Sequence, residues 1–249
     1  FAYGAPGTQK IEQNLKILFP EAKILRMDSD SARKRDTYKS MYNRMKNREV
    51  DILLGTQMIS KGLDFPLVTL VGIVMADISL NLPDFRAAER TFQLLTQVAG
   101  RSGRRDKIGE VIIQTYNPEH YSIVSASQQN YILFATEELG YRKKLYYPPY
   151  YRLARILFQS PDLELLKKEA LNIQEAADKL HKQFPVPQLF LLGVTPAPFS
   201  KISSYYRYHL IFKAQTVTVL QSAIKQFNST YHCPSNIHKQ IDIDPNNLM

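Results

Sequence analysis

The chain has 249 residues but only one cysteine, Cys233, and no tryptophan. A single cysteine excludes a disulfide framework, and with its neighbour His232 it provides only two of the four ligands that a structural zinc site needs. No apolar run is long enough to span a bilayer, and the opening Phe-Ala-Tyr-Gly lacks the basic and apolar regions of a signal peptide. These absences predict a cytoplasmic chain that binds no metal of its own and does not enter a membrane.

A second absence concerns nucleotide binding. The chain contains no phosphate loop of the form G-x-x-x-x-G-K-[ST] and no acidic magnesium-binding motif. The segment G-A-P-G-T that starts at Gly4 is rich in glycine, but no G-K-[ST] follows it. We therefore expect these residues alone to bind ATP very weakly and not to hydrolyse it.

Basic residues, in contrast, are in excess. The chain has 32 lysines and arginines against 23 aspartates and glutamates, which gives a formal net charge of +9. This excess favours a polyanionic partner such as a nucleic acid. Charge is a weak indicator, because many basic proteins bind no nucleic acid.

The segment Q-V-A-G-R-S-G-R contains Gln97, Arg101 and Arg104, spaced by four residues and then by three. On a helix or its frayed end this spacing places all three side chains on one side. Two guanidinium groups on one side suit a triphosphate, because each binds anionic oxygens at two points and stays charged. Gly100 and Gly103 leave room for a close backbone approach. The alternative is a helix C-terminus that ends at glycine, with arginines favoured by the helix dipole.

An upstream segment has the pattern of a strand followed by a binding loop. The apolar run D-I-L-L ends at Gly55 and Thr56, as strands often do beside a nucleotide in an α/β sheet. In the loop that follows, Asp64 has the chemistry to accept hydrogen bonds from a ribose. Three other residues are suited to phosphate: Thr56, Lys61 and Gly62. An ordinary surface loop with one lysine and one aspartate has a similar sequence, so both interpretations stay open.

Together these segments resemble motifs V and VI in the second RecA-like lobe of superfamily-two helicases. Three stretches are most similar to the PriA family, the bacterial replication-restart helicases also called primosomal protein N′. They are G-T-Q-M-x-x-K-G-x-D-F-P from Gly55, D-F-R-A-A-E-R-T-F-Q-L-L-T-Q-V-A-G-R-S-G-R from Asp84, and G-E-V-I-I-Q-T-Y-N-P-E-H from Gly109. Further matches, G-x-P-G-T-Q-K at residues 4–10 and E-L-x-x-R-K-x-x-x-Y-P-P-Y at 138–150, extend the resemblance over nearly the whole chain. Ser102 stands where this family more often has alanine.

The resemblance implies an ATP-dependent 3′-to-5′ DNA helicase that recognises stalled or abandoned replication forks and initiates primosome assembly. Arg101 and Arg104 would then act as arginine fingers, and Gln97 would orient the attacking water or the acidic motif of a first lobe. Gly62 and Asp64 would contact nucleotide. Thr56 and Gln57 would couple that contact to DNA.

The same resemblance implies cofactors and partners that lie partly outside this sequence. ATP with Mg²⁺ would be held mainly by a first lobe, and zinc would be bound only in the full-length protein, so the chain looks like a C-terminal fragment. The implied partners are branched and single-stranded DNA, single-stranded-DNA-binding protein and primosome proteins. The alternative is a nucleic-acid-binding or interaction module with no catalysis of its own. A Walker lysine upstream in the reading frame would decide between them.

Residues 1–147 are assigned to the second RecA-like helicase lobe, an α/β fold with a largely parallel sheet. The apolar pattern predicts strands at 22–27, 51–54, 68–75 and 109–115. It predicts a first helix capped by Thr8 and a second around residues 38–45. A third helix is expected to start at Asp84 and to direct Phe85, Phe92 and Leu95 inward.

Residues 148–249 are assigned to a small α+β C-terminal domain. Strands are predicted at 151–159, 189–193, 205–213 and 237–243, with helices at 162–184 and 216–228. This order, βαββαβ, is the ferredoxin-like pattern.

The second domain contains no catalytic constellation, but it has candidate DNA-binding residues. Lys201, Arg207 and Lys213 fall on or beside one predicted strand. Arg207 and Lys213 are an even number of residues apart, so their side chains leave the strand on the same face. We expect this basic face to bind phosphates, while the interleaved tyrosines fit a strand with one buried face better than base stacking.

Overall fold

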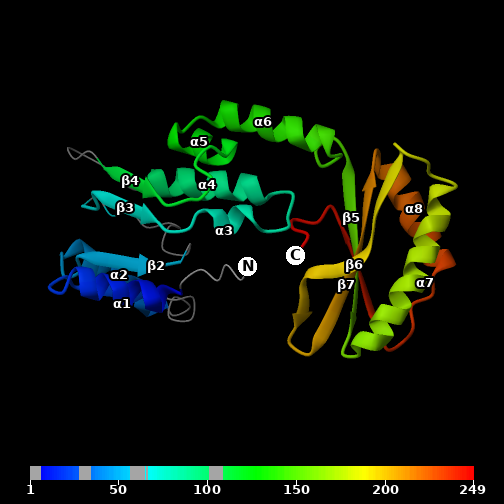
Figure 1. The fold of residues 1–249 in the computed structure, drawn as a ribbon, viewed down its shortest axis with the longest axis horizontal. Helices are drawn as coiled ribbons and strands as arrows, with labels where there is room; N and C mark the ends of the chain where they lie inside the picture. Colours follow the sequence, from blue (N-terminus) through cyan, green and yellow to red (C-terminus); the bar gives the residue numbers. More distant parts are fainter. Residues whose placement is uncertain (1–6, 28–34, 57–64, 66, 101–108) are drawn as a thin grey trace. The chain divides into compact units, whose positions relative to one another are not determined.

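The computed structural model describes residues 7–27, 35–56, 65, 67–100 and 109–249 (Figure 1). The chain divides into two compact units, one comprising Phe1–Leu82 and Ala88–Phe134, the other Pro83–Ala87 and Ala135–Met249. Among the described residues, no helix has the length and apolar character needed to cross a membrane.

The first unit contains two pairs of parallel strands. Strand β1 (Ile24–Met27) pairs with β2 (Ile52–Gly55), and β3 (Leu70–Ile73) pairs with β4 (Glu110–Ile113). Parallel pairing requires crossover connections, and helices lie between the strands in sequence. Helix α2 (Arg35–Lys46) lies between β1 and β2, and α3 (Asp77–Leu80) and α4 (Ala87–Ala99) lie between β3 and β4, while α1 (Thr8–Leu18) precedes β1 and α5 (Tyr121–Ser127) follows β4. The predicted α/β architecture with parallel strands is confirmed.

Two small apolar clusters stabilise this unit. Met41 of α2 packs with Met27 at the end of β1. In the second cluster, Phe92 and Leu95 of α4 are buried against Ile123 of α5, and Phe92 stacks on Phe134 with ring centroids 4.3 Å apart. The spacing of Phe92 and Leu95 places both on one helix face, as their predicted inward orientation requires.

Several predicted boundaries in this unit are wrong. Thr8 is the first helical residue and Gly7 occupies the cap position, where no side chain caps the helix. Helix α4 begins at Ala87, after a turn in which the Ala87 amide bonds to the Asp84 carbonyl, so Phe85 lies before the helix. Helices α3 and α5 were not predicted, nor was helix α6 (Tyr131–Lys144), which begins in this unit. Its apolar residues Ile132 and Leu139 are exposed, so it lacks the one-sided apolar stripe by which a helix is recognised in sequence.

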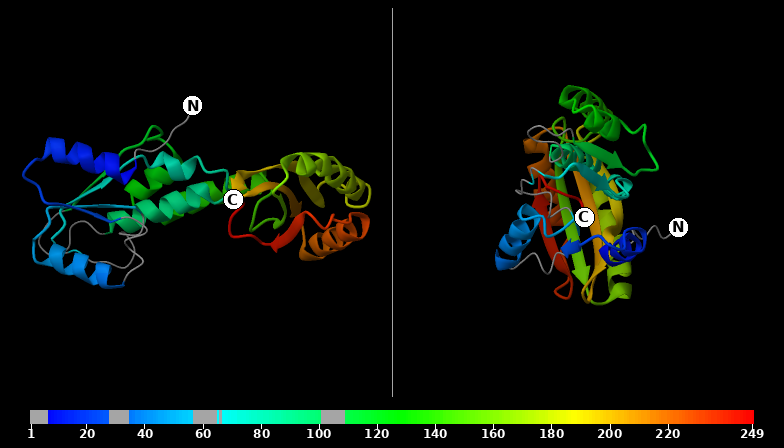
Figure 2. Two further views of the ribbon diagram at one scale, coloured as in Figure 1. Left: turned by 90° about the horizontal axis from the view of Figure 1, so that it is seen from below. Right: turned by 90° about the vertical axis from the view of Figure 1, so that its left-hand side faces the viewer.

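The second unit has the predicted βαββαβ order, which is confirmed. Its elements are β5 (Arg152–Ser160), α7 (Leu163–His181), β6 (Leu189–Ile202), β7 (Tyr205–Ala214), α8 (Val217–Thr230) and β8 (His238–Ile243). The strands form one antiparallel sheet in the order β6-β7-β5-β8. Figures 1 and 2 show α7 and α8 on the same side of this sheet, which leaves its other face free of helices.

Side chains alternate between the two faces of the sheet, and those of one face form the core under the helices. On β5, Ala154, Ile156 and Phe158 belong to the core beneath α7 and α8, together with Leu210 and Phe212 of β7. Both helices begin at side-chain caps: Asp162 accepts a hydrogen bond from the Leu165 amide, and Thr216 from the Val219 amide. Strand β6 is longer than predicted and continues to Ile202, with two irregularities in its pairing to β7.

Candidate functional site

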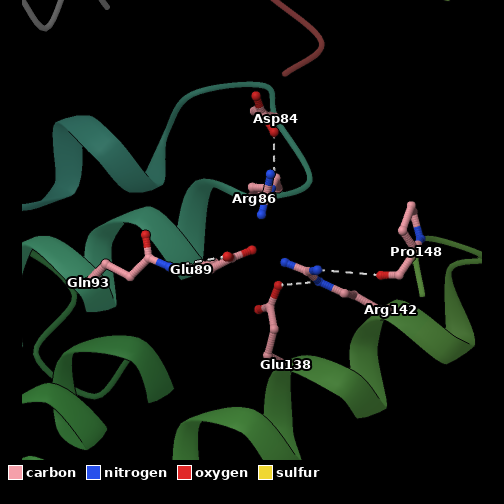
Figure 3. Close-up of polar contacts among 7 residues, drawn as sticks. All are labelled: Asp84, Arg86, Glu89, Gln93, Glu138, Arg142 and Pro148. Atoms are coloured by element: carbon pink, nitrogen blue, oxygen red, sulfur yellow. Dashed lines mark hydrogen bonds and ion pairs between the residues drawn. The ribbon is translucent and has the colours of Figure 1, made fainter. Parts of the chain in front are cut away.

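The two segments that resemble helicase motifs lie at the end of β2 and along α4, both in the first unit. Thr56 comes directly after β2 and is exposed, as a residue in a loop at a strand end should be. Gln97 lies near the C-terminal end of α4 and is also exposed. It continues a row at i, i+4 spacing with Glu89 and Gln93, whose side chains are joined by a 3.2 Å hydrogen bond (Figure 3).

The other predicted nucleotide-site and motif residues lie outside the described part of the chain. They are Gln57, Lys61, Gly62, Asp64, Arg101 and Arg104. Gly100, which precedes the first of the two arginines, is described, and its amide bonds to the Thr96 carbonyl at the end of α4. The predicted roles of these residues in ATP hydrolysis stay predictions.

The first unit contains a buried carboxylate that no sequence motif pointed to. Asp77, at the start of α3, is buried and accepts hydrogen bonds from the Thr115 hydroxyl, the Tyr116 amide and the Asn117 side chain. Burial by itself would raise the pKa of this carboxyl, but the three hydrogen bonds outweigh it and the pKa is lowered. Asp77 thus remains ionised and ties α3 to the chain after β4. Within the described residues, no group of three or more His, Cys, Asp and Glu side chains is placed to hold a metal ion.

Two of the three predicted basic residues of the second unit, Arg207 and Lys213, lie on the helix-free face of the sheet. Arg207 and Lys213 leave β7 on the same face, opposite to that of Leu210 and Phe212 in the core. The same-face prediction for these two residues is therefore confirmed. Both side chains are only 6% exposed, however, so this part of the face is not the solvated surface that phosphate binding requires.

Both buried cations are bonded to backbone carbonyls. The Lys213 ammonium donates a 3.0 Å hydrogen bond to the Leu145 carbonyl, and the Arg207 guanidinium donates one of 3.2 Å to the Phe199 carbonyl. Alternation along a strand predicts which residues share a face, but it does not predict which other segments cover that face. Here the chain before β5 and the distal part of β6 supply the covering groups.

Burial also changes the proton affinity of this face. Desolvation lowers the pKa of Lys213 to about 8. For His209, which lies between Arg207 and Lys213 in sequence on the same face, burial and the positive charges of Arg155 and Arg207 lower the pKa to about 4. The Arg207 pKa is lowered by burial and then by Arg155. Arg155 and Arg207 are thus two neighbouring buried cations, and His209 beside them is neutral at pH 7.

The hairpin between β6 and β7 has the exposed basic and aromatic groups that the buried cluster lacks. Lys201 is exposed, and its ammonium lies 3.2 Å from the hydroxyl and 4.5 Å from the ring centroid of Tyr206, its cross-strand neighbour. Phe199 and Tyr205 are about half exposed in the same hairpin. The sequence from Leu189 to Ala214 contains no aspartate or glutamate. Cations and rings without acidic neighbours suit a single-stranded nucleic acid.

Two protein-family models match the chain. Residues 143–246 match the primosomal protein N C-terminal domain, and residues 5–106 match the helicase conserved C-terminal domain. The first match covers most of the second unit, and the second covers the segments with the helicase-like motifs.

Three curated relatives carry the description replication restart protein PriA. The chain is 41% identical over 244 residues to that of Bacillus subtilis, which covers 98% of this chain and 30% of the relative. The chain is 38% identical over 248 residues to that of Treponema pallidum, and this match covers 99% of this chain and 37% of the relative. It is 40% identical over 242 residues to that of Synechocystis, and this match covers 96% of this chain and 28% of the relative. The chain thus spans about a third of the length of these relatives. Among solved structures, the designed protein Foldit4 is 8% identical, and the match covers 37% of this chain and 94% of Foldit4. Its TM-score of 0.28 is too low to bear on the fold.

Proposed function

The chain belongs to the PriA family of replication restart proteins, and we propose that it supplies the second helicase lobe and the C-terminal domain of an ATP-dependent 3′-to-5′ DNA helicase. The observation that supports this most directly is the match of residues 5–106 to the helicase conserved C-terminal domain. That match includes Thr56 at the end of β2 and Gln97 on the exposed side of α4, just before the two arginines of G-R-S-G-R.

The proposed chemistry is hydrolysis of ATP coupled to strand separation in the full-length protein. Arg101 and Arg104 would contact the phosphoryl group as it is transferred, because guanidinium groups stabilise the charge that spreads over its oxygens. Gln97 would orient the attacking water. ATP with Mg²⁺ would bind mainly to a first lobe. From this chain, Gly62 and Asp64 would contact the nucleotide, and Thr56 with Gln57 would link that contact to DNA.

We further propose that the C-terminal domain contacts DNA at stalled or abandoned replication forks, in concert with single-stranded-DNA-binding protein and primosome proteins. Lys201 and the rings near it in the β6–β7 hairpin are better placed for this contact than Arg207 and Lys213. The latter two are buried and bonded to backbone carbonyls, so they stabilise the domain.

A second candidate function is that of a binding module without catalysis. One observation favours it for this stretch of chain taken alone: the sequence has no phosphate loop. A purified preparation of the 249 residues should accordingly show no ATPase activity, and robust hydrolysis by it would contradict the two-lobe mechanism.

The arginine assignment is tested in the full-length protein by Arg104→Ala. Loss of an arginine finger reduces turnover by about 10³-fold or more, and DNA affinity should change little because the proposed contact of Arg104 is with the nucleotide. Arg44→Ala is the matched control, since Arg44 is an exposed arginine on α2 that forms only a 3.9 Å ion pair with Glu49. DNA-stimulated ATPase and fluorescence anisotropy on a forked duplex measure the two properties. If Arg104→Ala kept more than about a tenth of the wild-type rate, the assignment would be wrong.

A further inference from the structure

A short segment before α4 is part of the C-terminal unit, although elements of the first unit flank it in sequence. This segment, Pro83–Ala87, ends at the first residue of α4, while Ala88 and the rest of that helix belong to the first unit. Whatever holds residues 83–87 therefore acts directly on the start of α4.

Stacked aromatic rings provide the main contact of this segment. The Phe85 ring lies parallel to that of Tyr147, with 5.3 Å between centroids and 4° between planes. Each ring also contacts one cation. The Arg142 guanidinium is 5.3 Å from the Phe85 centroid, and the Lys213 ammonium is 3.5 Å from the Tyr147 centroid. Such ring pairs and cation–ring contacts stabilise a docked conformation beyond the apolar area they bury.

Hydrogen bonds on either side of Phe85 fix the backbone of the segment. The Asp84 carboxylate accepts bonds from the Arg86 amide at 2.9 Å and from the Leu248 amide at 3.3 Å, and the residue is only 9% exposed. The Arg86 guanidinium donates a 3.5 Å bond to the Asn246 side chain. Figure 3 shows Asp84 and Arg86 in the turn before α4. The segment is therefore attached to the far end of the sequence by two separate groups.

The surface that receives Phe85 is itself held in place. Arg142 of α6 forms a 2.6 Å ion pair with Glu138, one helical turn earlier, and donates a 3.4 Å bond to the Pro148 carbonyl (Figure 3). Both side chains of the ion pair are largely buried. The guanidinium beside Phe85 thus has a defined position set by α6 and by the chain that leads into β5.

We propose that Asp84 and Phe85 are positioning residues through which the C-terminal domain sets the placement of α4 and of the nucleotide-site residues at its other end. Gln97 follows Ala87 by ten residues, about 15 Å along a helix. A helix is stiff over that distance, so a displacement of its first turn reaches its last turn. DNA that binds the C-terminal domain changes the rate of ATP hydrolysis through this segment. This inference rests on the helicase function proposed above.

The test uses the full-length protein with two conservative variants. Phe85→Leu keeps an apolar side chain but loses the stack, and Asp84→Asn keeps the shape but loses one acceptor. We measure ATPase activity without DNA, its stimulation by a single-stranded oligonucleotide and by a forked duplex, and DNA affinity by anisotropy. The stimulation should fall by about fivefold or more in each variant, while the DNA-free rate and the affinity stay within about twofold of wild type.

Matched controls separate this effect from general damage. Phe19→Leu changes an exposed phenylalanine after α1, and Asp178→Asn changes an exposed aspartate on α7. Both should keep wild-type stimulation. Both Phe85→Leu and Tyr147→Leu remove the stack, so each is made alone and the two are combined in a double variant. If the two rings act as one unit, the double variant loses no more stimulation than the more affected single variant.

A structural measurement gives an independent readout. Hydrogen exchange of peptides that cover residues 87–99 should change when forked DNA binds to the wild-type protein and should not change in Asp84→Asn. Wild-type stimulation in both variants, or an unaltered exchange response in Asp84→Asn, would overturn the coupling and leave the helicase function intact. A wild-type protein without DNA-stimulated ATPase would instead overturn the helicase function, and this inference with it.

Discussion

Arg155 on β5 and His209 on β7 are diagonal neighbours on the helix-free face of the C-terminal sheet, since Arg155 pairs with Ile211 and Leu157 pairs with His209. Both side chains are 7% exposed. Within the described residues, neither Arg155 Nε nor His209 Nδ1 has a hydrogen-bond partner. A buried imidazole beside a guanidinium is held in its neutral form, because protonation would add a second desolvated positive charge.

This relationship predicts acid sensitivity that depends on His209. The pKa of His209 is about 4 in the folded chain and near its usual 6.5 in the unfolded chain. Between these values only the unfolded state takes up the proton, so stability falls as the pH drops from 6.5 towards 4, by roughly 3 kcal/mol in total. His209→Gln should remove most of that slope in urea unfolding at pH 7 and pH 4.5. The control His238→Gln, at an exposed position on β8, should keep it.

The buried Lys213 predicts how folding stability changes at alkaline pH. Burial lowers its pKa to about 8, against 10.5 for the exposed side chain. Above pH 8 the folded state releases this proton before the unfolded state does, so this group makes the fold more stable as the pH rises from 8 towards 10. Tyr147, beside it, has a pKa raised by burial and then by the charge of Asp84, and remains protonated over this range. Lys213→Met should abolish the alkaline gain, and a gain of wild-type size in the variant would refute the assignment.

The hairpin at the end of β6 and β7 predicts the salt dependence of DNA binding. Lys201→Gln removes one exposed cation, so binding to a single-stranded oligonucleotide should weaken and the slope of log affinity against log salt should become shallower by about one. Lys167→Gln is the control, because Lys167 is an exposed lysine on α7 that pairs with Glu164. Anisotropy titrations at several salt concentrations give both slopes. Equal slopes for the two variants would argue against a hairpin contact.

Helix α7 offers a test of which apolar residues stabilise the second unit. Ile173 is fully buried at 0% exposure, whereas Leu171 on the same helix is 69% exposed. Ile173→Ala leaves a cavity beneath the sheet and should cost about 2–5 kcal/mol of unfolding free energy, while Leu171→Ala should stay within about 0.5 kcal/mol. Chemical denaturation of the two variants measures the difference. Similar losses in both would contradict the observed packing of α7.

Much of the secondary structure could be predicted from the sequence, because the preference for a strand or a helix depends on residues that are close together in the chain. The sequence predicts strands at 151–159 and 205–213 and helices that start at Asp162 and Thr216, in close agreement with β5, β7, α7 and α8. The family assignment also follows from contiguous stretches, such as that from Asp84 to Arg104, and needs no coordinates. Helices α3, α5 and α6 are exceptions, and in α6 the exposed apolar residues conceal the helical period.

The sequence by itself therefore determined the element order of the C-terminal domain, its likeness to a replication-restart helicase, and the face that Arg207 and Lys213 share. The three-dimensional arrangement alone decided that this face is covered at those two residues and that Phe85 stacks on Tyr147 instead of beginning a helix. The physical reason is that a strand or helix has a period that can be read from a few residues. Burial depends on which residues distant in sequence come to lie over a side chain in the folded protein, as Leu145 does at Lys213 and Leu248 at Asp84.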